Sequence, residues 1–456
     1  MDSQPSLLQE PRKLQRLRCS VQNYDWGRRG YHSRVASLFA SNSGSEIQSD
    51  KPYAELWMGT HESGPSFLAQ TTDDNGVSGV TLKSWIFENP DVLGDKVSEK
   101  WGRDLPFLFK VLSVAKALSI QAHPDKELAR ALHKTRPDLY KDGNHKPEMA
   151  LAITEFEALC GFISLEHACA LASAFLVLIF HIKPFQPGSE EELKGVLHNV
   201  PEIVEVVSSA DANKIFHLDE QDEEQKVKSV LRSTFTKLML ASKETIMGVI
   251  SEMKSRLHME SQVRQLTDKE LLVLRLEKQY PGDVGVISAF FFNYVKLNPG
   301  EALYLGANEP HAYLCGECLE CMATSDNVVR AGLTPKLRDV QALCSMLTYK
   351  QGMPEILQGV PLNSYVTRYL PPFDEFEVDR CILPKGESTV FPPVAGPSIF
   401  LALVGEGMMH TGSSKGDVVI EGDVLFAPAN SEISITAASE LVLYRAGVNN
   451  RFFQAS

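Results

Sequence analysis

The sequence has few cysteines, no excess of positive charge and no long apolar run, and each absence excludes a class of protein. Eight cysteines in 456 residues are too few for a disulfide framework, so we expect free thiols in a reducing compartment. The net charge of -13 argues against nucleic acid or an anionic membrane as the main partner. The apolar stretch 168–180 is shorter than the ~20 residues that a membrane helix needs.

The first residues also lack the continuous apolar segment of a secretory signal. We therefore expect a cytoplasmic monomer that binds neither nucleic acid nor a membrane. A composition of 43% apolar and 23% charged residues is typical of a globular protein. The chain is longer than one hydrophobic core usually serves, so we expect two or three domains.

The apolar pattern predicts a mostly β protein with a helical insert. Short β-rich pieces alternate with glycine and serine turns over residues 24–61, a short helix is expected at 81–89, and 286–294 reads as a strand. A stripe of apolar residues at helical spacing consists of Val227, Val230, Leu231, Phe235, Leu238 and Met239. Another helix is expected to begin at the capping box formed by Thr267 and Glu270.

One sequence pattern occurs twice. Residues 300–308 and 422–430 both run from a glycine turn through an acidic residue and an apolar strand to Ala-Asn. Such a duplication implies two related β-barrels in one chain. The copies then differ, because the first reaches His311 where the second has Ile433, so only the first keeps a side chain that binds metals.

Four polar side chains are expected at strand ends of the first barrel. Gln121 and His123 are two residues apart, so both project from one face of a strand that Pro124 ends. Glu148 stands at the start of another strand, and His311 follows the repeat. Two imidazoles, a carboxylate and an amide suit zinc, with manganese and iron left open, and a further coordination position would admit substrate.

The string Cys315, Cys318 and Cys321 resembles a metal-binding spacing but lies within an expected strand. Positions three apart in a strand face opposite sides, so we interpret these residues as buried structural thiols. His61 has no partner at ligand spacing, and we interpret it as a hydrogen-bonded structural residue.

Several longer strings resemble the type I phosphomannose isomerases and occur in the order typical of that family. They are NYDWG, YAELWMGTH, QAHPDK, HKPEMA, YLGANEPHAYL and SDNVVRAGLTPKLRD. The resemblance covers most of the chain and implies two cupin-type (jelly-roll) β-barrels plus an inserted α-helical domain. It also implies one zinc ion per chain and interconversion of D-mannose 6-phosphate and D-fructose 6-phosphate through an enediol, which feeds mannose into GDP-mannose synthesis.

The resemblance further assigns roles to residues of this sequence. The zinc ligands fall on the four side chains already reached by spacing, namely Gln121, His123, Glu148 and His311. The active-site arginine falls on Arg330, and the phosphate-binding positions resemble Ser119, Lys110 and Lys336. The general base that moves a proton between C2 and C1 is left open among Glu320, Lys146 and His145.

Two other functions share parts of this pattern. A cupin oxygenase would bind iron, but it usually presents a His-x-His pair where this chain has Gln121. A non-catalytic, metal-bound sugar-phosphate sensor would keep the cations, and the retained Glu320 argues against it.

The expected catalytic barrel is split into residues 12–165 and 283–350, with a helical domain at 166–282 and a barrel without metal ligands at 351–456. Residues 162–166 would join directly to 192–197, a join that resembles one helix start in the family. We therefore expect 167–191 to be an insertion of this isoform.

Overall fold

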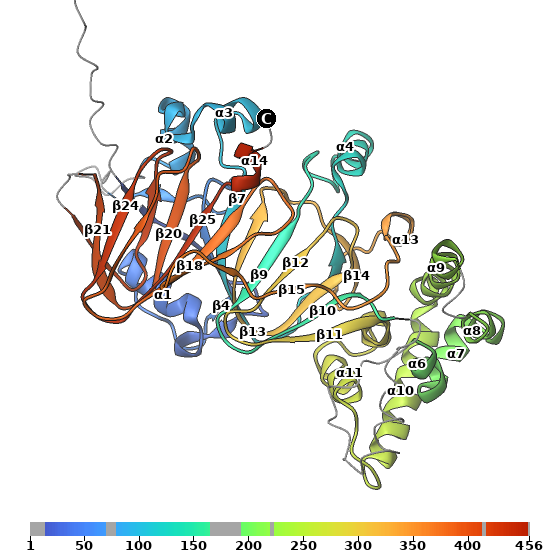
Figure 1. Ribbon diagram of the computed structural model, residues 1–456. Helices are drawn as coiled ribbons and strands as arrows, with labels where there is room; N and C mark the ends of the chain where they lie inside the picture. Colours follow the sequence, from blue (N-terminus) through green and yellow to red (C-terminus); the bar gives the residue numbers. More distant parts are fainter. Residues whose placement is uncertain (1–13, 70–78, 165–192, 219–222, 413–415, 455–456) are drawn as a thin grey trace, which may run out of the picture.

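The computed structural model describes residues 14–69, 79–164, 193–218, 223–412 and 416–454 (Figure 1). The predicted insertion 167–191 lies outside the described residues. Strands predominate, and the longer helices gather at one end of the molecule, so the predicted mostly β architecture with a helical region is confirmed (Figure 1). In the described ranges, no helix has both the length and the apolar character needed to cross a membrane.

An eleven-stranded sheet of the described residues carries the strands of the predicted site. Its strands are β2 (Ser20–Gln22), β5 (Glu55–Met58), β7 (Phe107–Val114), β8 (Ile120–Ala122), β9 (Glu148–Ala152), β10 (Phe156–Phe162), β11 (Phe292–Leu297), β12 (Ala302–Leu305), β13 (His311–Ala323), β14 (Val329–Gly332) and β15 (Ile356–Leu357). The long strand β13 organises this sheet, because it pairs with β7, β8, β9 and β10 along different parts of its length. Every residue of β7 is buried, which explains its nearly continuous apolar sequence.

The carboxy-terminal part forms further sheets. Among the described residues, an eight-stranded sheet has the order β16-β17-β18-β25-β20-β23-β1-β6, and a four-stranded sheet has the order β19-β24-β21-β22. These strands are β1 (Gln15–Arg18), β6 (Phe67–Leu68), β16 (Val360–Pro361), β17 (Val366–Tyr369), β18 (Glu377–Leu383), β19 (Ser388–Phe391), β20 (Ser398–Val404), β21 (Glu406–Thr411), β22 (Asp417–Ile420), β23 (Val424–Ala427), β24 (Ile433–Ala437) and β25 (Leu441–Gly447). The pairing of β1 with β23 puts the start of the described chain in the carboxy-terminal sheet.

One buried cluster joins the two β-rich parts. It includes Leu319 of β13 and Met149 of β9 together with Ile399 and Leu401 of β20. Because these side chains are fully or almost fully buried, the two parts share a hydrophobic core.

The predicted sequence repeat is matched by the backbone. Gly300 and Gly422 have φ angles of 92° and 90°, and Asn308 and Asn430 have φ angles of 63° and 62°. These positive angles suit glycine and asparagine, which explains why both residue types occur at both places. The strands that follow begin at His311 and at Ile433, the two positions that the sequence aligned.

The helical region extends from the eleven-stranded sheet (Figure 1). Its helices are α6 (Leu193–Asn199), α7 (Pro201–Val207), α8 (Ser209–Phe216), α9 (Glu224–Leu240), α10 (Lys243–Glu260) and α11 (Asp268–Gln279). The apolar stripe of α9 is buried in part against the sheet, where Phe235 contacts the rings of Phe162 and Phe292 at centroid distances of 5.3 and 5.7 Å. The predicted capping box of Thr267 and Glu270 begins α11 and is confirmed.

Two secondary-structure predictions were wrong. The predicted strand 286–294 is helical over most of its length, as α12 (Val284–Ser288) and η3 (Ala289–Phe291), and a strand begins only at Phe292. A short buried apolar run fits either structure, and here the Asp283 side chain caps the helix by accepting from Gly285 N. The β-rich region near the start also contains α1 (Arg34–Ser43), which Ser33 caps.

Two other predictions were confirmed. The expected short helix is α2 (Leu82–Glu88), with Thr81 as its N-cap. Cys318 and Cys321 lie in different buried clusters, on opposite faces of β13, and the cysteines that the structure describes are all free thiols. Cys315, the other cysteine of the string, is only half-buried, so the predicted burial was wrong for this residue.

Candidate active site

Strand pairing brings three predicted metal ligands together. His123 directly follows β8, Glu148 begins β9, and His311 begins β13. The register opposes His311 to Gln121 on β8, and it opposes Leu305, which ends β12 six residues before His311, to Glu148 on β9. As a result, side chains far apart in the sequence lie close together.

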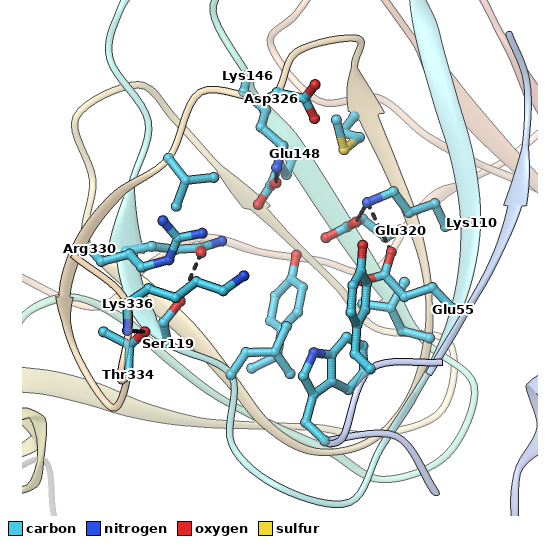
Figure 2. A pocket seen from close by; sticks show the side chains of 18 of the residues that line it. Glu55, Lys110, Ser119, Lys146, Glu148, Glu320, Asp326, Arg330, Thr334 and Lys336 are labelled. Carbon is cyan, nitrogen blue, oxygen red and sulfur yellow. Dashed lines mark hydrogen bonds and ion pairs between the residues drawn. The ribbon is translucent and has the colours of Figure 1, made fainter. Parts of the chain in front are cut away.

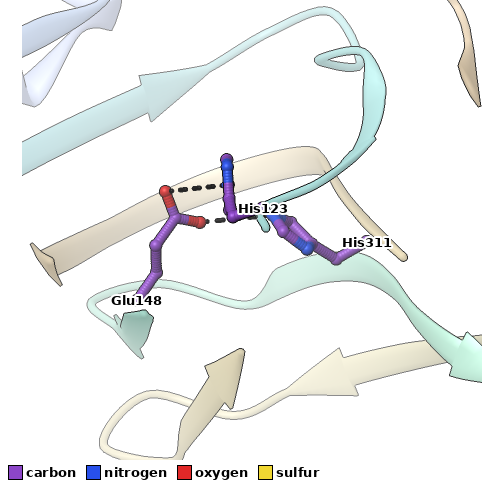
Figure 3. Close-up of side chains that lie close together, drawn as sticks. All are labelled: His123, Glu148 and His311. Carbon is purple, nitrogen blue, oxygen red and sulfur yellow. Dashed lines mark ion pairs between the residues drawn. The ribbon is translucent and has the colours of Figure 1, made fainter. Parts of the chain in front are cut away.

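His123, Glu148 and His311 form a compact buried group (Figure 3). Each residue is only 1% exposed, and their potential ligand atoms all lie within 4.8 Å of one another. Glu148 presents Oε1 at 3.4 Å from Nε2 of His123 and Oε2 at 3.2 Å from Nε2 of His311.

The hydrogen bonds of the two imidazoles orient their metal-binding atoms. Nδ1 of His123 lies 2.6 Å from Asn327 O, and Nδ1 of His311 lies 3.0 Å from Glu309 O. Since a carbonyl only accepts, each Nδ1 donates its proton, and the Nε2 lone pair of a neutral ring faces Glu148. Burial lowers the pKa of His123 to about 4, so this ring is neutral at physiological pH.

The group therefore fits a cation. His123 Nε2, Glu148 Oε2 and His311 Nε2 are buried and have no hydrogen-bond partner. Burial acts to raise the pKa of Glu148, but the pKa stays well below its usual value, and the positive charge of Lys146 beside it contributes to this lowering. Three buried acceptors that face one another without a donor are stabilised when a metal ion lies among them, because burying such groups unpaired is costly.

Gln121 lies beside this group on β8. Its register partners are His311 on β13 and Arg330 on β14, so it sits between an imidazole and a guanidinium. Its Oε1 accepts a hydrogen bond from Ser119 Oγ at 3.2 Å. The amide side chain lines the same hollow as Glu148.

A hollow of about 460 Å³ opens next to the metal-binding group (Figure 2). Among the predicted site residues, it is lined by Lys110, Ser119, Gln121, Lys146, Glu148, Glu320, Arg330 and Lys336. Figure 2 shows Arg330, Lys336 and Ser119 on one side and Lys110, Glu320 and Glu55 on the other. The hollow is large enough for a small polar substrate.

One side of the hollow holds buried charges of both signs. Lys110 Nζ lies 2.8 Å from Glu320 Oε2 and 3.3 Å from Glu55 Oε2, and Trp57 Nε1 donates to Glu55 Oε2 at 2.5 Å. Burial raises the pKa of Glu320, an effect that Lys110 opposes and that the charges of Glu148 and Glu55 reinforce. Because Lys110 is paired with two carboxylates, the geometry does not support the phosphate-binding role expected for it.

The other side is cationic. Burial lowers the pKa of Arg330, whose guanidinium lines the hollow, and within the described ranges no carboxylate lies at ion-pair distance from it. Lys336 is exposed and reaches the same side from the turn after β14, where its backbone N–H donates to Thr334 Oγ1. Ser119 lies on the same side and adds a neutral hydroxyl group.

The other two candidates for the general base differ in position. His145 Nε2 lies 2.8 Å from Glu375 Oε1, and the residue is not part of the lining of the hollow. Lys146 lines the hollow and holds its Nζ 3.3 Å from Glu148 Oε1. His145 therefore connects the turn before β9 to the carboxy-terminal part of the chain.

Three acidic residues that line the hollow, Asp25, Glu55 and Asp326, were not predicted from the sequence as site residues. Asp326 follows β13, and His61 Nε2 approaches its carboxylate at 3.3 Å, an interaction that lowers the pKa of Asp326. His61 also accepts a hydrogen bond from Ser63 N at its Nδ1, so it is hydrogen-bonded as predicted, and it lines the hollow as well. Asp326 lies four residues before Arg330 of β14, and this closeness in the sequence was the one signal that could have indicated Asp326 as a site residue.

Comparison with known proteins identifies the family. Residues 14–165 match the catalytic domain of type I phosphomannose isomerase, and residues 203–292 match its helical insertion domain. The chain is 63% identical to mannose-6-phosphate isomerase 1 of Arabidopsis thaliana over 97% of this chain and 95% of that protein. It is 40% identical to the mannose-6-phosphate isomerase of Homo sapiens over 94% of this chain and 97% of the other.

Solved structures agree with these matches. A mutant of phosphomannose isomerase from Salmonella typhimurium superposes with a TM-score of 0.74 at 27% identity, covering 96% of this chain and 99% of the other. A mannose 6-phosphate isomerase bound with zinc and yttrium superposes with a TM-score of 0.73 at 26% identity, with the same coverage. The chain thus belongs to the type I phosphomannose isomerases, the family of mannose-6-phosphate isomerase enzymes.

Proposed function

We propose that the protein interconverts D-mannose 6-phosphate and D-fructose 6-phosphate with one zinc ion per chain, held by Gln121, His123, Glu148 and His311. The observation that carries this proposal is the trio of buried acceptors, His123 Nε2, Glu148 Oε2 and His311 Nε2, which face one another without a donor. Nitrogen and oxygen ligands without a thiolate suit zinc. When bound there, zinc supplies a Lewis acid that polarises the oxygens on C1 and C2 of the sugar.

The cationic side of the hollow binds the phosphate of the open-chain sugar in this proposal. Ser119 offers a hydroxyl donor and Lys336 an exposed ammonium group on that side. Arg330 adds a guanidinium whose charge no neighbouring carboxylate in the described ranges neutralises, so it can stabilise charge that develops on the sugar. On a chain of net charge -13, a dianionic substrate depends on such a local cluster.

Glu320 is the general base in this proposal. It lines the hollow opposite the cationic side, and burial raises its pKa, which makes its carboxylate a stronger base. Lys110 and Glu55 position it, since both lie on the same buried chain of contacts. Lys146, next to Glu148, is the alternative base, whereas the hydrogen bond of His145 to Glu375 supports a structural role for that residue.

The proposal extends to the whole protein. The chain forms two cupin-type barrels, the second without metal ligands, and the helical domain divides the first near the boundaries expected from the sequence. The matched backbone angles at the two copies of the repeat support this arrangement. In this proposal the protein is a cytoplasmic monomer that binds neither nucleic acid nor a membrane. Its reaction feeds mannose into GDP-mannose synthesis.

A metal-exchange assay tests this function. Protein stripped of metal by a chelator is expected to lose isomerase activity on mannose 6-phosphate, and added zinc is expected to restore it in proportion to the zinc bound. A protein that binds zinc and substrate but forms no fructose 6-phosphate would be a sensor. Oxygen consumption with the iron-loaded protein would indicate an oxygenase instead.

A further inference from the structure

A second hollow of about 590 Å³ adjoins the first at the junction of the helical region and the sheet. It is lined by the start of α10, by the turn 279–284 after α11, by Lys116 and by the loop 334–338 after β14. Lys116, Tyr280 and Lys336 line both hollows, so the two share a wall. Ser119 and Arg330, which the proposed function assigns to the substrate, line only the first.

The second hollow collects positive charge on an acidic protein. Lys116, Lys243, Lys336 and Arg338 line it, while Asp283 is its one acidic residue in the part of the chain that the structure describes. Lys243 and Arg338 have no carboxylate at ion-pair distance within the described ranges. Lys116 is paired with Asp25, whose Oδ2 lies 3.7 Å from its Nζ, so among the described residues the uncompensated charge comes from Lys243, Lys336 and Arg338. On a chain with a net charge of -13, three such cations in one hollow favour the binding of an anion.

Asp283 forms no ion pair with these cations within the described ranges. Its Oδ1 accepts from the backbone N–H groups of Gly285 and Leu333, both at 2.7 Å, and its Oδ2 accepts from Thr334 N at 3.2 Å. The carboxylate is thereby committed to the backbone of α12 and of the loop after β14. Its charge serves to hold that loop in place.

Other lining groups are donors. Gln279 accepts from Ala117 N through Oε1, which leaves its amide N–H groups to donate. Arg338 uses Nη1 on Ala331 O at 3.3 Å and keeps further N–H groups. The 18-residue helix α10 begins at Lys243, so the positive end of its dipole lies at the hollow as well.

We propose that this second hollow is an anion site that binds the phosphate group of a small phosphorylated metabolite, separately from the site for the substrate phosphate. Lys243 and Arg338 hold the phosphate, with Gln279 as a neutral donor. Because Lys336 borders both hollows, two phosphates bound at once repel each other and compete for one ammonium group. A phosphate bound in the second hollow therefore weakens binding of the substrate phosphate in the first hollow. A phosphorylated metabolite thus inhibits the isomerase without entering the hollow beside the metal-binding group.

The test uses inorganic phosphate as the probe and the metal-loaded full chain. Equilibrium dialysis at saturating phosphate is expected to find two phosphates per wild-type chain, the second bound more weakly than the first. The double variant Lys243→Ala/Arg338→Ala is expected to keep the phosphate of the first hollow. Its affinity for phosphate in the second hollow is expected to fall at least about tenfold, because charge-assisted contacts are lost. Its kcat and KM for mannose 6-phosphate at low phosphate are expected to stay unchanged.

The matched control is Lys278→Ala/Lys385→Ala, which removes the same charge at two exposed positions that line neither hollow. The single variant Lys243→Ala, in the exposed first turn of α10, provides a second comparison if the double variant folds poorly. A single phosphate per wild-type chain, or equal loss of phosphate in the control, would overturn the proposal. Phosphate counting does not depend on turnover, so this result is separate from that of the proposed isomerase activity.

Discussion

Lys110 Nζ and Glu320 Oε2 lie 2.8 Å apart, and both side chains are almost completely buried although they are 210 residues apart in the sequence. The register of β7 with β13 opposes these two residues directly. A buried ion pair costs desolvation energy, and here Glu55 adds a second carboxylate to the same ammonium group. The arrangement gives the hollow one side with paired charges of both signs and one cationic side, to which the proposed function assigns proton transfer and phosphate binding.

The first prediction concerns the pH dependence of activity. Burial raises the pKa of Glu320. The charge of Lys110 opposes this increase, and the charge of Glu55 adds to it. If Glu320 acts as the base, activity falls as the pH drops through its pKa. Lys110→Met is therefore expected to move the acidic limb of the kcat/KM profile to higher pH, and Glu55→Gln to lower pH. Shifts in the same direction, or no shift in either variant, would exclude Glu320 as the base.

The second prediction concerns the metal. His311→Ala removes one of three buried ligand atoms, so zinc affinity is expected to fall at least about 100-fold while the fold remains intact. His133→Ala is the control, because this half-buried histidine hydrogen-bonds to Tyr140 O away from the hollow. Zinc content after dialysis against a chelator and circular dichroism measure the two effects. Full zinc occupancy in the His311 variant would contradict the ligand assignment.

The third prediction concerns the substrate phosphate. Lys336→Ala is expected to weaken mannose 6-phosphate and inorganic phosphate alike, since a charge-assisted contact contributes ~1.5–3 kcal/mol, roughly 10- to 150-fold in affinity. Mannose without the phosphate serves as the internal control, because its slow turnover is expected to be equal in both proteins. Unchanged KM and unchanged inhibition by phosphate would refute the contact.

The fourth prediction concerns stability. Phe235 is fully buried between α9 and the sheet and contacts Phe162, Phe291 and Phe292. Phe235→Ala is expected to lower the free energy of unfolding by ~3–5 kcal/mol. Leu240→Ala on the same helix is the control, because Leu240 is 68% exposed and its loss is expected to change stability by less than ~0.5 kcal/mol. Urea denaturation of both variants measures the difference, and equal midpoints would show that α9 does not anchor the helical region.

Features encoded locally could be predicted from the sequence. Thr267 and Glu270 cap α11 through contacts within one turn, and Gly300 and Asn308 adopt the positive φ angles that their residue types favour. The helical segment that begins at Val284 could not be predicted, because a short run of buried apolar residues has no period that separates strand from helix. Its cap, Asp283, was a signal that the apolar run obscured.

Contacts between distant strands limited prediction of the site. The ends of strands were correctly expected at His123, Glu148 and His311, because proline and the repeat mark those positions in the sequence. The pairing of Lys110 with Glu320 and Glu55 depends on which strands neighbour β7, and no local pattern contains that information. The same holds for His145, whose partner Glu375 comes from the carboxy-terminal part.

Isomerisation of mannose 6-phosphate in deuterated water, with the zinc-loaded protein and with the chelator-treated protein, tests the central claim most directly. Proton transfer through an enediol predicts that fructose 6-phosphate forms only with the metal and carries deuterium at C1, as measured by NMR. Absence of fructose 6-phosphate with the zinc-loaded protein, or product without deuterium after many turnovers, would contradict the account.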